Sequence, residues 1–330
     1  SIPVGQLMNK IGKRKTVVIS LLATALAMCV PIISYTYPAM IVAVCLLGIG
    51  NCILQVSLNP LVTCVVSKEK LASTLTTGQF VKAIGGFLTP LLAGWMAQWS
   101  GNWLLIFPLY TAISVIATIW MYATKVDESQ FGSTRTSSIS DCFKLVATPA
   151  IFILFLGIFC NVGLDVGFNT TIPLIMQERF GISADAALKF NSIYFASRTI
   201  ACFAGSFLLA RFSSKKIFAI SAAVLVVAIV GFFVGESRGV MIAAIILAGA
   251  GNSNVFSILF SKALLYKPEK SNELSSIMIM GLIGGAVFPL IMGPLVDNVF
   301  GNQNGAVAVI AAGVAYLAFL AVKMKEDSEI

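Results

Sequence analysis

The sequence contains no histidine, and only 11% of its 330 residues are charged. The absence of histidine excludes imidazole catalysis and histidine metal sites, and the seven cysteines have none of the CxxC spacing that indicates metal or redox chemistry. The glycine-rich stretches lack the Gly-Lys-Ser/Thr sequence of a phosphate-binding loop. We therefore expect no enzyme activity, no cofactor and no metal site.

What the sequence has in abundance is apolar side chains, which make up 58% of the chain and give a mean hydropathy of +0.93. Soluble domains have roughly 45–50% apolar residues and about 25% charged ones. Runs of about 20 apolar residues are long enough to cross a bilayer. The sequence predicts an all-α membrane protein whose spans lie near residues 16–36, 39–66, 71–97, 103–124, 148–173, 186–210, 216–234, 239–262, 274–296 and 304–322. Residues 1–9 are interpreted as the end of a further helix, so we expect the chain to begin within a longer protein.

Most of the 22 Lys and Arg residues fall in alternate connections between these spans. Basic residues in short loops remain on the cytoplasmic side, so this pattern predicts that both ends of the chain are cytoplasmic. The net charge of +8 is then explained by membrane topology. The expected partner is the lipid bilayer, and nucleic-acid binding is not expected.

An internal repeat runs through the chain. Residues 48–51 (GIGN) recur as residues 249–252 (GAGN), and the glycine–proline pattern of residues 84–94 recurs at 283–293. The two offsets are nearly equal, and the basic loops indicate that both copies cross the membrane in the same direction. Parallel repeats of this kind are known in transporters built from two six-helix halves.

The repeat predicts three regions and twelve spans in the intact protein. Residues 1–124 form an N-terminal helical half that lacks its first helix and most of its second. Residues 125–146, the longest polar stretch, form a cytoplasmic linker, and residues 147–330 form a six-helix C-terminal half.

Several motifs resemble those of the major facilitator superfamily. Residues 5–15 (GQLMNKIGKRK) are similar to its signature between the second and third helices, and residues 54–60 (LQVSLNP) resemble the fourth-helix pattern L-E-x-x-x-N-P of its fucose/glucose/galactose proton symporter branch. Further similarity lies at residues 205–212, 252–260 and 283–289. The resemblance implies a monomeric secondary active transporter of a monosaccharide or a related polyhydroxylated solute, coupled to protons by symport, in a bacterial cytoplasmic (inner) membrane. It also implies a cytoplasmic gate motif formed by Gly5, Asn9, Lys10, Gly12, Lys13 and Arg14.

Three positions depart from the family pattern. Asn9 replaces the usual aspartate of the signature, so that contact is expected to rest on a hydrogen bond. Gln55 replaces the fourth-helix glutamate that the resemblance would assign to substrate and proton handling. Lys82 replaces the asparagine of the fifth-helix pattern Q-x-x-N.

Charged side chains inside predicted spans are functional candidates, because a charge is costly in the membrane. Lys82, Asp165 and Arg198 are such residues. Asp165 either forms a permanent pair with Lys82 or Arg198, or it titrates and releases one of them during transport. Arg198 remains protonated, so it anchors either an acid or the solute.

Gln55, Lys82, Arg198 and Asn252 lie 11 to 13 residues from the ends of their predicted spans, which is about 16–20 Å at a helical rise of ~1.5 Å per residue. This depth places them near the midplane, where transporters of this kind bind solute. The amides and aromatic rings at this level suit sugar hydroxyls and sugar faces. The predicted solute contacts are Gln55, Asn59, Gln79, Lys82, Asn161, Asn252, Asn254 and Phe256.

Two alternatives stay open. Lys82 and Arg198 carry two positive charges against the one negative charge of Asp165. This excess of positive charge means that an anionic solute such as a sugar acid would also fit. A membrane sensor that binds solute without transporting it would use the same residues.

Overall fold

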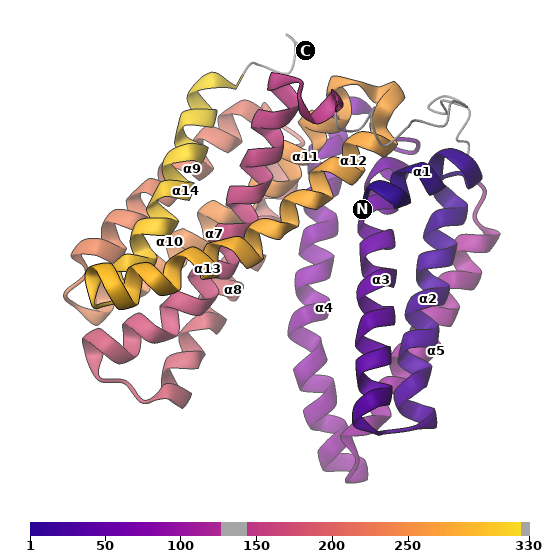
Figure 1. Ribbon diagram of the computed structural model, residues 1–330, viewed down its shortest axis with the longest axis horizontal. Helices are drawn as coiled ribbons and strands as arrows, with labels where there is room; N and C mark the ends of the chain where they lie inside the picture. The colour runs from indigo at the N-terminus through magenta and orange to yellow at the C-terminus, as the bar shows by residue number, and fades with distance from the viewer. Residues whose placement is uncertain (127–143, 325–330) are drawn as a thin grey trace. The chain divides into compact units, whose positions relative to one another are not determined.

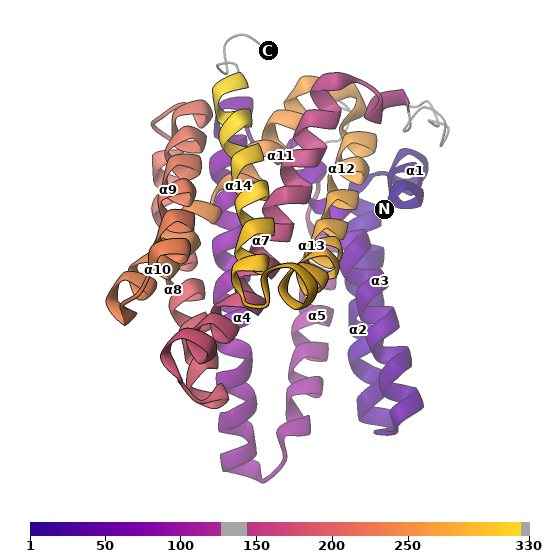
Figure 2. The same cartoon turned by 60° about the vertical axis from the view of Figure 1, so that its left-hand side comes forward.

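The computed structural model describes residues 1–126 and 144–324, and these form helices without any strand (Figures 1 and 2). Most of the predicted linker, 125–146, lies outside the described residues. Each predicted span corresponds to a helix or to a helix with a break in it. The expected all-α architecture is confirmed for the part of the chain that the structure describes.

Two compact units make up the chain. Unit 1 comprises Ser1–Lys68, Lys82–Leu145 and Lys267–Ile279, and unit 2 comprises Glu69–Val81, Val146–Tyr266 and Met280–Ile330. These units differ from the predicted sequence halves at two segments, 69–81 and 267–279, which lie 198 residues apart. The offset is close to that of the internal repeat, so the two segments hold equivalent positions in the two halves.

Unit 1 is built around α2, which packs against α3 and α5. Between α1 and α2, Gly12 has φ +92°, a backbone conformation that favours glycine, and this single residue changes the direction of the chain between the two helices. Gly50 of α3 lies so close to α2 that a Cβ there would be 2.9 Å from Thr24 Oγ1. The helices of this unit are α1 (Ile2–Ile11), α2 (Lys13–Ile33), α3 (Tyr37–Val62), the later part of α4 (Leu71–Ser100), α5 (Ile106–Ala123) and nearly all of α12 (Ser271–Met280), with 3₁₀ turns η2 (Trp103–Leu105) and η3 (Pro268–Lys270). The 3₁₀ turn η1 (Lys68–Lys70) has its first residue in unit 1 and the other two in unit 2.

Unit 2 is centred on α7, which contacts α8, α13 and α14. Phe288 of α13 is buried between Gly163 of α7 and Gly313 of α14. A Cβ would lie 2.3 Å from the Phe288 ring if it were added to Gly163, and 3.1 Å from it if it were added to Gly313. Small residues at such crossings let membrane helices approach closely. The helices of this unit are the start of α4 together with α7 (Pro149–Phe180), α8 (Ala184–Leu208), α9 (Ser214–Val234), α10 (Arg238–Asn252), α11 (Val255–Tyr266), α13 (Gly284–Pro294) and α14 (Asn304–Lys323).

Breaks interrupt two of the predicted spans. The span predicted at 239–262 is divided into α10 and α11 at Ser253–Asn254, and the span predicted at 274–296 is divided by the 3₁₀ turn η4 (Gly281–Ile283) between α12 and α13. A π-helical segment, η5 (Leu295–Phe300), follows α13 and ends at Gly301. Apolar periodicity did not reveal these breaks, because both sides of each break remain apolar.

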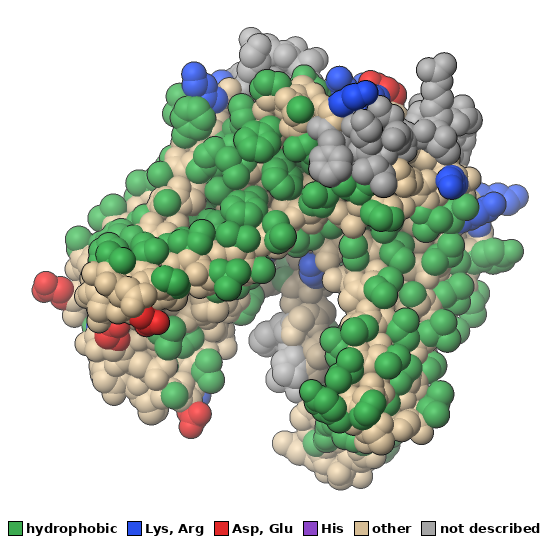
Figure 3. All heavy atoms as spheres, in the orientation of Figure 1, with side chains coloured by type: hydrophobic (Ala, Val, Ile, Leu, Met, Phe, Trp, Pro, Cys, Tyr) green, Lys and Arg blue, Asp and Glu red, His purple; other side chains and the backbone are tan. Residues whose placement is uncertain are grey.

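The outer surface of the helices is hydrophobic. Figure 3 shows green side chains over the flank of α2, α3 and α5, with blue Lys and Arg gathered at the end of this flank near α1. Among the exposed side chains are Ile33, Tyr37 and Trp120. Within the described residues, eight helical stretches are long and apolar enough to cross a membrane: Lys13–Ile33, Tyr37–Val62, Trp103–Ala123, Pro149–Phe180, Ser214–Val234, Arg238–Tyr266, Pro268–Phe300 and Asn304–Lys323. The other two predicted spans correspond to α4 and α8, which contain the charged Lys82 and Arg198.

An arginine fastens one end of unit 2. Arg179, in the last turn of α7, donates from Nη1 to the carbonyl of Phe232 at 2.8 Å and to that of Gly235 at 3.4 Å, and from Nη2 to Asn304 Oδ1 at 2.6 Å. The carbonyls at the end of α9 have no helical partner of their own, so this guanidinium satisfies them. One side chain thereby joins the ends of α7, α9 and α14.

Candidate functional site

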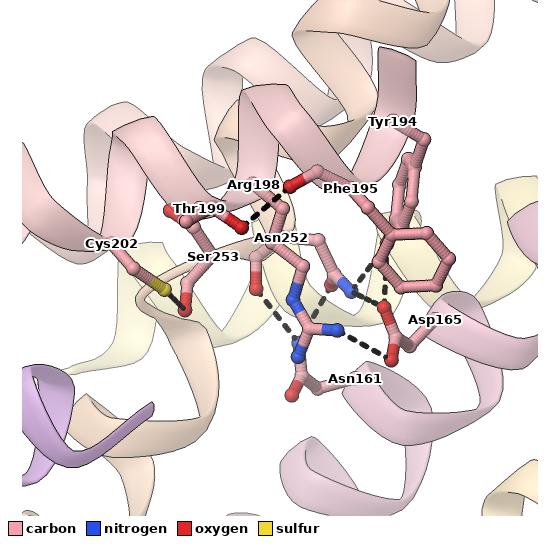
Figure 4. Close-up of polar contacts among 9 residues, drawn as sticks. All are labelled: Asn161, Asp165, Tyr194, Phe195, Arg198, Thr199, Cys202, Asn252 and Ser253. Carbon is pink, nitrogen blue, oxygen red and sulfur yellow. Dashed lines mark hydrogen bonds and ion pairs between the residues drawn. The ribbon is translucent and has the colours of Figure 1, made fainter. Parts of the chain in front are cut away.

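The ion pair predicted among the buried charges lies within unit 2. Asp165 of α7 accepts a bond at Oδ2 from Arg198 Nη1 of α8 at 2.8 Å, and at Oδ1 from the hydroxyl of Tyr194 at 2.7 Å (Figure 4). Tyr194 and Arg198 are one helical turn apart, so they lie on the same face of α8. Of the alternatives left open by the sequence, the structure shows the pairing of Asp165 with Arg198.

A third helix contributes to this cluster through Asn252, the last residue of α10. Asn252 Nδ2 donates to the Tyr194 hydroxyl at 3.2 Å and approaches Asp165 Oδ1 at 3.4 Å, while Asn252 Oδ1 accepts from Asn161 Nδ2 at 2.6 Å. The amide groups of Asn161 and Asn252 therefore connect α7 and α10 to the Tyr194 hydroxyl. We call these five residues (Asn161, Asp165, Tyr194, Arg198 and Asn252) the polar network.

The polar network is located at the break between α10 and α11. A break in a membrane helix frees backbone carbonyls that then need other partners. Asn161 Nδ2 lies 3.5 Å from the carbonyl oxygen of Asn252, and the thiol of Cys202 lies 3.3 Å from that of Ser253. Asn161 and Cys202 thus supply bonds that the broken helix lacks, a role for Cys202 that the sequence did not predict.

Depth and exposure distinguish the members of the network. With a rise of ~1.5 Å per residue, Arg198 lies about 21 Å from the start of α8 and about 15 Å from its end, so it is near mid-span. The side chains of Arg198 and Asp165 are 26% and 24% exposed. Tyr194, Asn161 and Asn252 are buried behind this pair.

This burial bears on three predicted solute contacts. Asn161 and Asn252 bond to each other, and Asn254 is buried against Gly205, where a Cβ would lie 2.1 Å from Asn254 Oδ1. None of the three amides is presented at a surface in this conformation, so a solute would reach them only after the network rearranges. Phe256 is half-buried, and its ring centroid lies 5.4 Å from that of Phe260.

The remaining predicted contacts lie on α3 and α4. Gln55 Nε2 is 3.3 Å from Asn51 Oδ1, and Asn59 Nδ2 donates to the carbonyl of Gln55 at 3.0 Å, so these amides line one face of α3. Gln79 is half-buried and Lys82, about one turn further along α4, is exposed. Asn51 also belongs to the polar face of α3. The internal repeat makes Asn51 the equivalent of Asn252, because residues 48–51 recur as residues 249–252.

A second polar cluster lies in unit 1, where the predicted gate motif meets α12. Asn9 Nδ2 donates to Glu273 Oε1 at 2.8 Å, Asn272 Nδ2 donates to Asn9 Oδ1 at 2.6 Å, and Lys13 Nζ donates to Ser271 Oγ at 3.2 Å. We call these residues (Asn9, Lys13, Ser271, Asn272 and Glu273) the α1–α12 cluster. The expectation that Asn9 acts through a hydrogen bond agrees with this geometry.

Glycine permits the close contact beside this cluster. A Cβ on Gly5 would lie 2.3 Å from Ser276 Oγ, so α12 rests directly on the backbone of α1. Arg14 fastens the neighbouring end of α5, since its Nε donates to the carbonyl of Met121 at 3.3 Å and its Nη2 donates to that of Tyr122. Lys10 is exposed, and Gly12 makes the turn between α1 and α2.

Sequence reasoning missed Glu273. The span was predicted to begin at residue 274, whereas the helix begins at Ser271 and buries Glu273 to 2% exposure. The signal was present as an acidic residue in the first turn of a helix, where a carboxylate is favoured by the helix dipole. Glu273 is therefore a second acid among these helices, and it is more deeply buried than Asp165.

Comparisons with known proteins agree with the helical architecture. The family model described as Major Facilitator Superfamily matches residues 1–281. A glucose/galactose transporter of Brucella abortus is 24% identical over 338 residues, which cover 97% of this chain and 80% of the relative.

Two solved structures share the fold. The E. coli fucose:proton symporter FucP has a TM-score of 0.86 at 20% identity, with 98% of this chain and 86% of that chain covered. The human organic anion transporter MFSD10 has a TM-score of 0.78 at 16% identity, with 97% and 78% covered. The names of these two proteins refer to different classes of solute, so the shared fold does not select the solute of this chain.

Proposed function

Because the chain belongs to the Major Facilitator Superfamily, we propose that it moves a monosaccharide or a related small polyhydroxylated solute across a membrane by alternating access. The observation that carries this proposal is the similarity to a glucose/galactose transporter along 97% of the chain. The polar network supports it, because ionisable groups at mid-span in a transporter mark a solute or ion pathway.

We further propose that transport is coupled to protons by symport. FucP, which shares the fold, is named a fucose:proton symporter. Asp165 is the candidate acid, because its carboxylate is partly exposed and holds Arg198. A proton on Asp165 would remove the charge that holds Arg198, and this change would alter the site that the solute meets.

The proposed topology places the basic connections, and hence both ends of this chain, on the cytoplasmic side of a bacterial inner membrane. In this orientation the α1–α12 cluster lies at the cytoplasmic end of unit 1. We propose that its bonds hold the cytoplasmic side closed in one state of the transport cycle. The proposed functional form is a monomer, with the N-terminal and C-terminal sequence halves as its two domains.

Counterflow in proteoliposomes tests the transport proposal. Vesicles that contain the complete protein are loaded with unlabelled glucose, galactose or fucose and diluted into the labelled sugar. A transporter accumulates label transiently, whereas a sensor that only binds solute cannot exchange it. Absence of counterflow with every neutral sugar tried, in vesicles with correctly folded protein, would refute the proposal.

A sugar acid remains a second candidate solute, since Lys82 is an exposed cation on α4 and MFSD10 is named an organic anion transporter. The pairing of Arg198 with Asp165 weakens this alternative, because the charge of Arg198 is already balanced. Competition decides between the two: inhibition of labelled uptake by a uronate but not by a neutral sugar would replace the proposed solute class.

A further inference from the structure

Arg198 uses only part of its hydrogen-bonding capacity. A guanidinium carries five N–H donors. Among the described residues, its hydrogen bond is the one from Nη1 to Asp165 Oδ2, and the side chain is 26% exposed. The donors on Nη2 and Nε thus have no partner among the described residues, and they belong to a side chain that is partly exposed.

Asp165, in contrast, already accepts at both of its oxygens. Its Oδ2 accepts from Arg198, and its Oδ1 accepts from Tyr194 and lies within reach of Asn252 (Figure 4). Most of the acceptor sites of the carboxylate are therefore used within the polar network. Its position between Arg198 and the buried residues makes it a support for the guanidinium.

The buried residues determine the orientation of this support. Asn161 donates to Asn252 Oδ1, which turns Asn252 Nδ2 towards Tyr194 and Asp165. The Tyr194 hydroxyl accepts from Asn252 and donates to Asp165. Each bond defines the direction of the next, so the Asp165 carboxylate that accepts from Arg198 is held by a chain of contacts from three helices.

We infer that Arg198 is a solute contact that determines specificity, and that its planar N–H fork binds two adjacent hydroxyl oxygens of a neutral sugar. Asp165, Tyr194, Asn252 and Asn161 are positioning residues that act through Arg198. This inference rests on the proposed function and deepens it. A fork of parallel donors fits paired oxygens, which a lysine ammonium cannot reproduce. Because Asp165 balances the charge, the site offers directed donors without a net positive charge that would favour an anion.

Deoxy sugars provide a test that separates solute contact from structural support. For the wild-type protein, replacement of one of the two bound hydroxyls by hydrogen is expected to weaken binding about 10- to 100-fold, the usual range for a hydrogen bond to a charged group. R198K retains the positive charge next to Asp165 but loses the fork. It is expected to bind the parent sugar more weakly and to bind the parent and deoxy sugars with nearly equal affinity.

The measurement is inhibition of counterflow by a series of monodeoxy sugars, one for each ring position. If R198K discriminates among the deoxy sugars as the wild type does, Arg198 does not contact the solute and the inference is overturned, while the proposed function stands. If the wild type shows no sugar counterflow at all, the proposed function fails and the inference fails with it. Should R198K not fold, R198Q provides the same comparison, because a glutamine amide can still donate to Asp165 but lacks the guanidinium fork.

The positioning residues have their own test. Y194F removes the bond to Asp165 and is expected to reduce discrimination among the deoxy sugars while leaving the protein folded. Y316F is the matched control, because the hydroxyl of Tyr316 donates to the carbonyl of Ile153 at 3.0 Å, away from the polar network. If Y194F discriminates no differently from Y316F, Tyr194 has no positioning role.

Discussion

Replacement of Asn9 by aspartate should release α12 from α1. In the α1–α12 cluster, the Asn9 amide donates to Glu273 Oε1 at 2.8 Å, and Glu273 is only 2% exposed. N9D replaces this donor by a second carboxylate. The variant has the residue that is usual in the family signature, yet here it would face an acid.

The size of the effect follows from two contributions. Loss of a hydrogen bond to a charged group costs about 1.5–3 kcal/mol. Two unit charges that relax to 4 Å apart repel each other by about 4 kcal/mol at an effective dielectric constant of 20. The two contributions add to about 6 kcal/mol, whereas uptake of a proton by one carboxylate would remove the repulsion and leave about 2 kcal/mol. We take about 3 kcal/mol as the net cost, which corresponds to roughly a 100-fold shift in equilibrium.

Cysteine labelling measures this shift. Ser276 is buried where α12 rests on Gly5, so S276C, in a background without the seven native cysteines, should react slowly with a maleimide. N9D should accelerate its labelling by about two orders of magnitude, in line with the shift in equilibrium. K10Q is the control, because Lys10 is exposed on the same helix.

The double variant N9D/E273Q tests the cause. A glutamine at position 273 can donate to the new carboxylate, so the hydrogen bond is restored with its direction reversed, and labelling should slow again towards the parent rate. The reasoning is refuted if N9D leaves the labelling of S276C unchanged, or if addition of E273Q to N9D has no effect.

Three further predictions concern other sites. R179A should lower the melting temperature in detergent, because it removes about 2 kcal/mol or more of hydrogen bonding at the end of α9. R179K should restore only part of the lost melting temperature. Equal melting temperatures of R179A and the wild type would contradict this prediction. Gly284→Ala should reduce the yield of folded protein, because the new Cβ would lie 2.0 Å from the carbonyl oxygen of Phe159. The control is Gly85→Ala, at the equivalent position of the repeat, where the new Cβ would meet open space and should be tolerated. Size-exclusion profiles of the two variants measure the difference. Lys82→Ala and Asp165→Asn should each abolish uptake while folded protein remains in the membrane, and wild-type uptake in either would remove that residue from the mechanism.

Much of the fold could be predicted from the sequence, because a helix that crosses a membrane needs about 20 consecutive, predominantly apolar residues. The start of α3 and the end of α9 lie within two residues of their predicted positions. The breaks at Ser253–Asn254 and at Gly281–Ile283 could not be predicted in this way. They depend on partners from other helices, such as Asn161 and Cys202, that satisfy the freed backbone groups.

For the candidate site, the sequence by itself identified the residues that had to be explained. Lys82, Asp165 and Arg198 were recognised because a charge in an apolar run is costly wherever it lies. Only the tertiary structure decided that Asp165 pairs with Arg198, that Asn161 and Asn252 are enclosed behind this pair, and that Glu273 is buried against Asn9. The physical reason is that hydrophobicity is a property of a segment, whereas the direction and length of a hydrogen bond depend on how separate helices pack together.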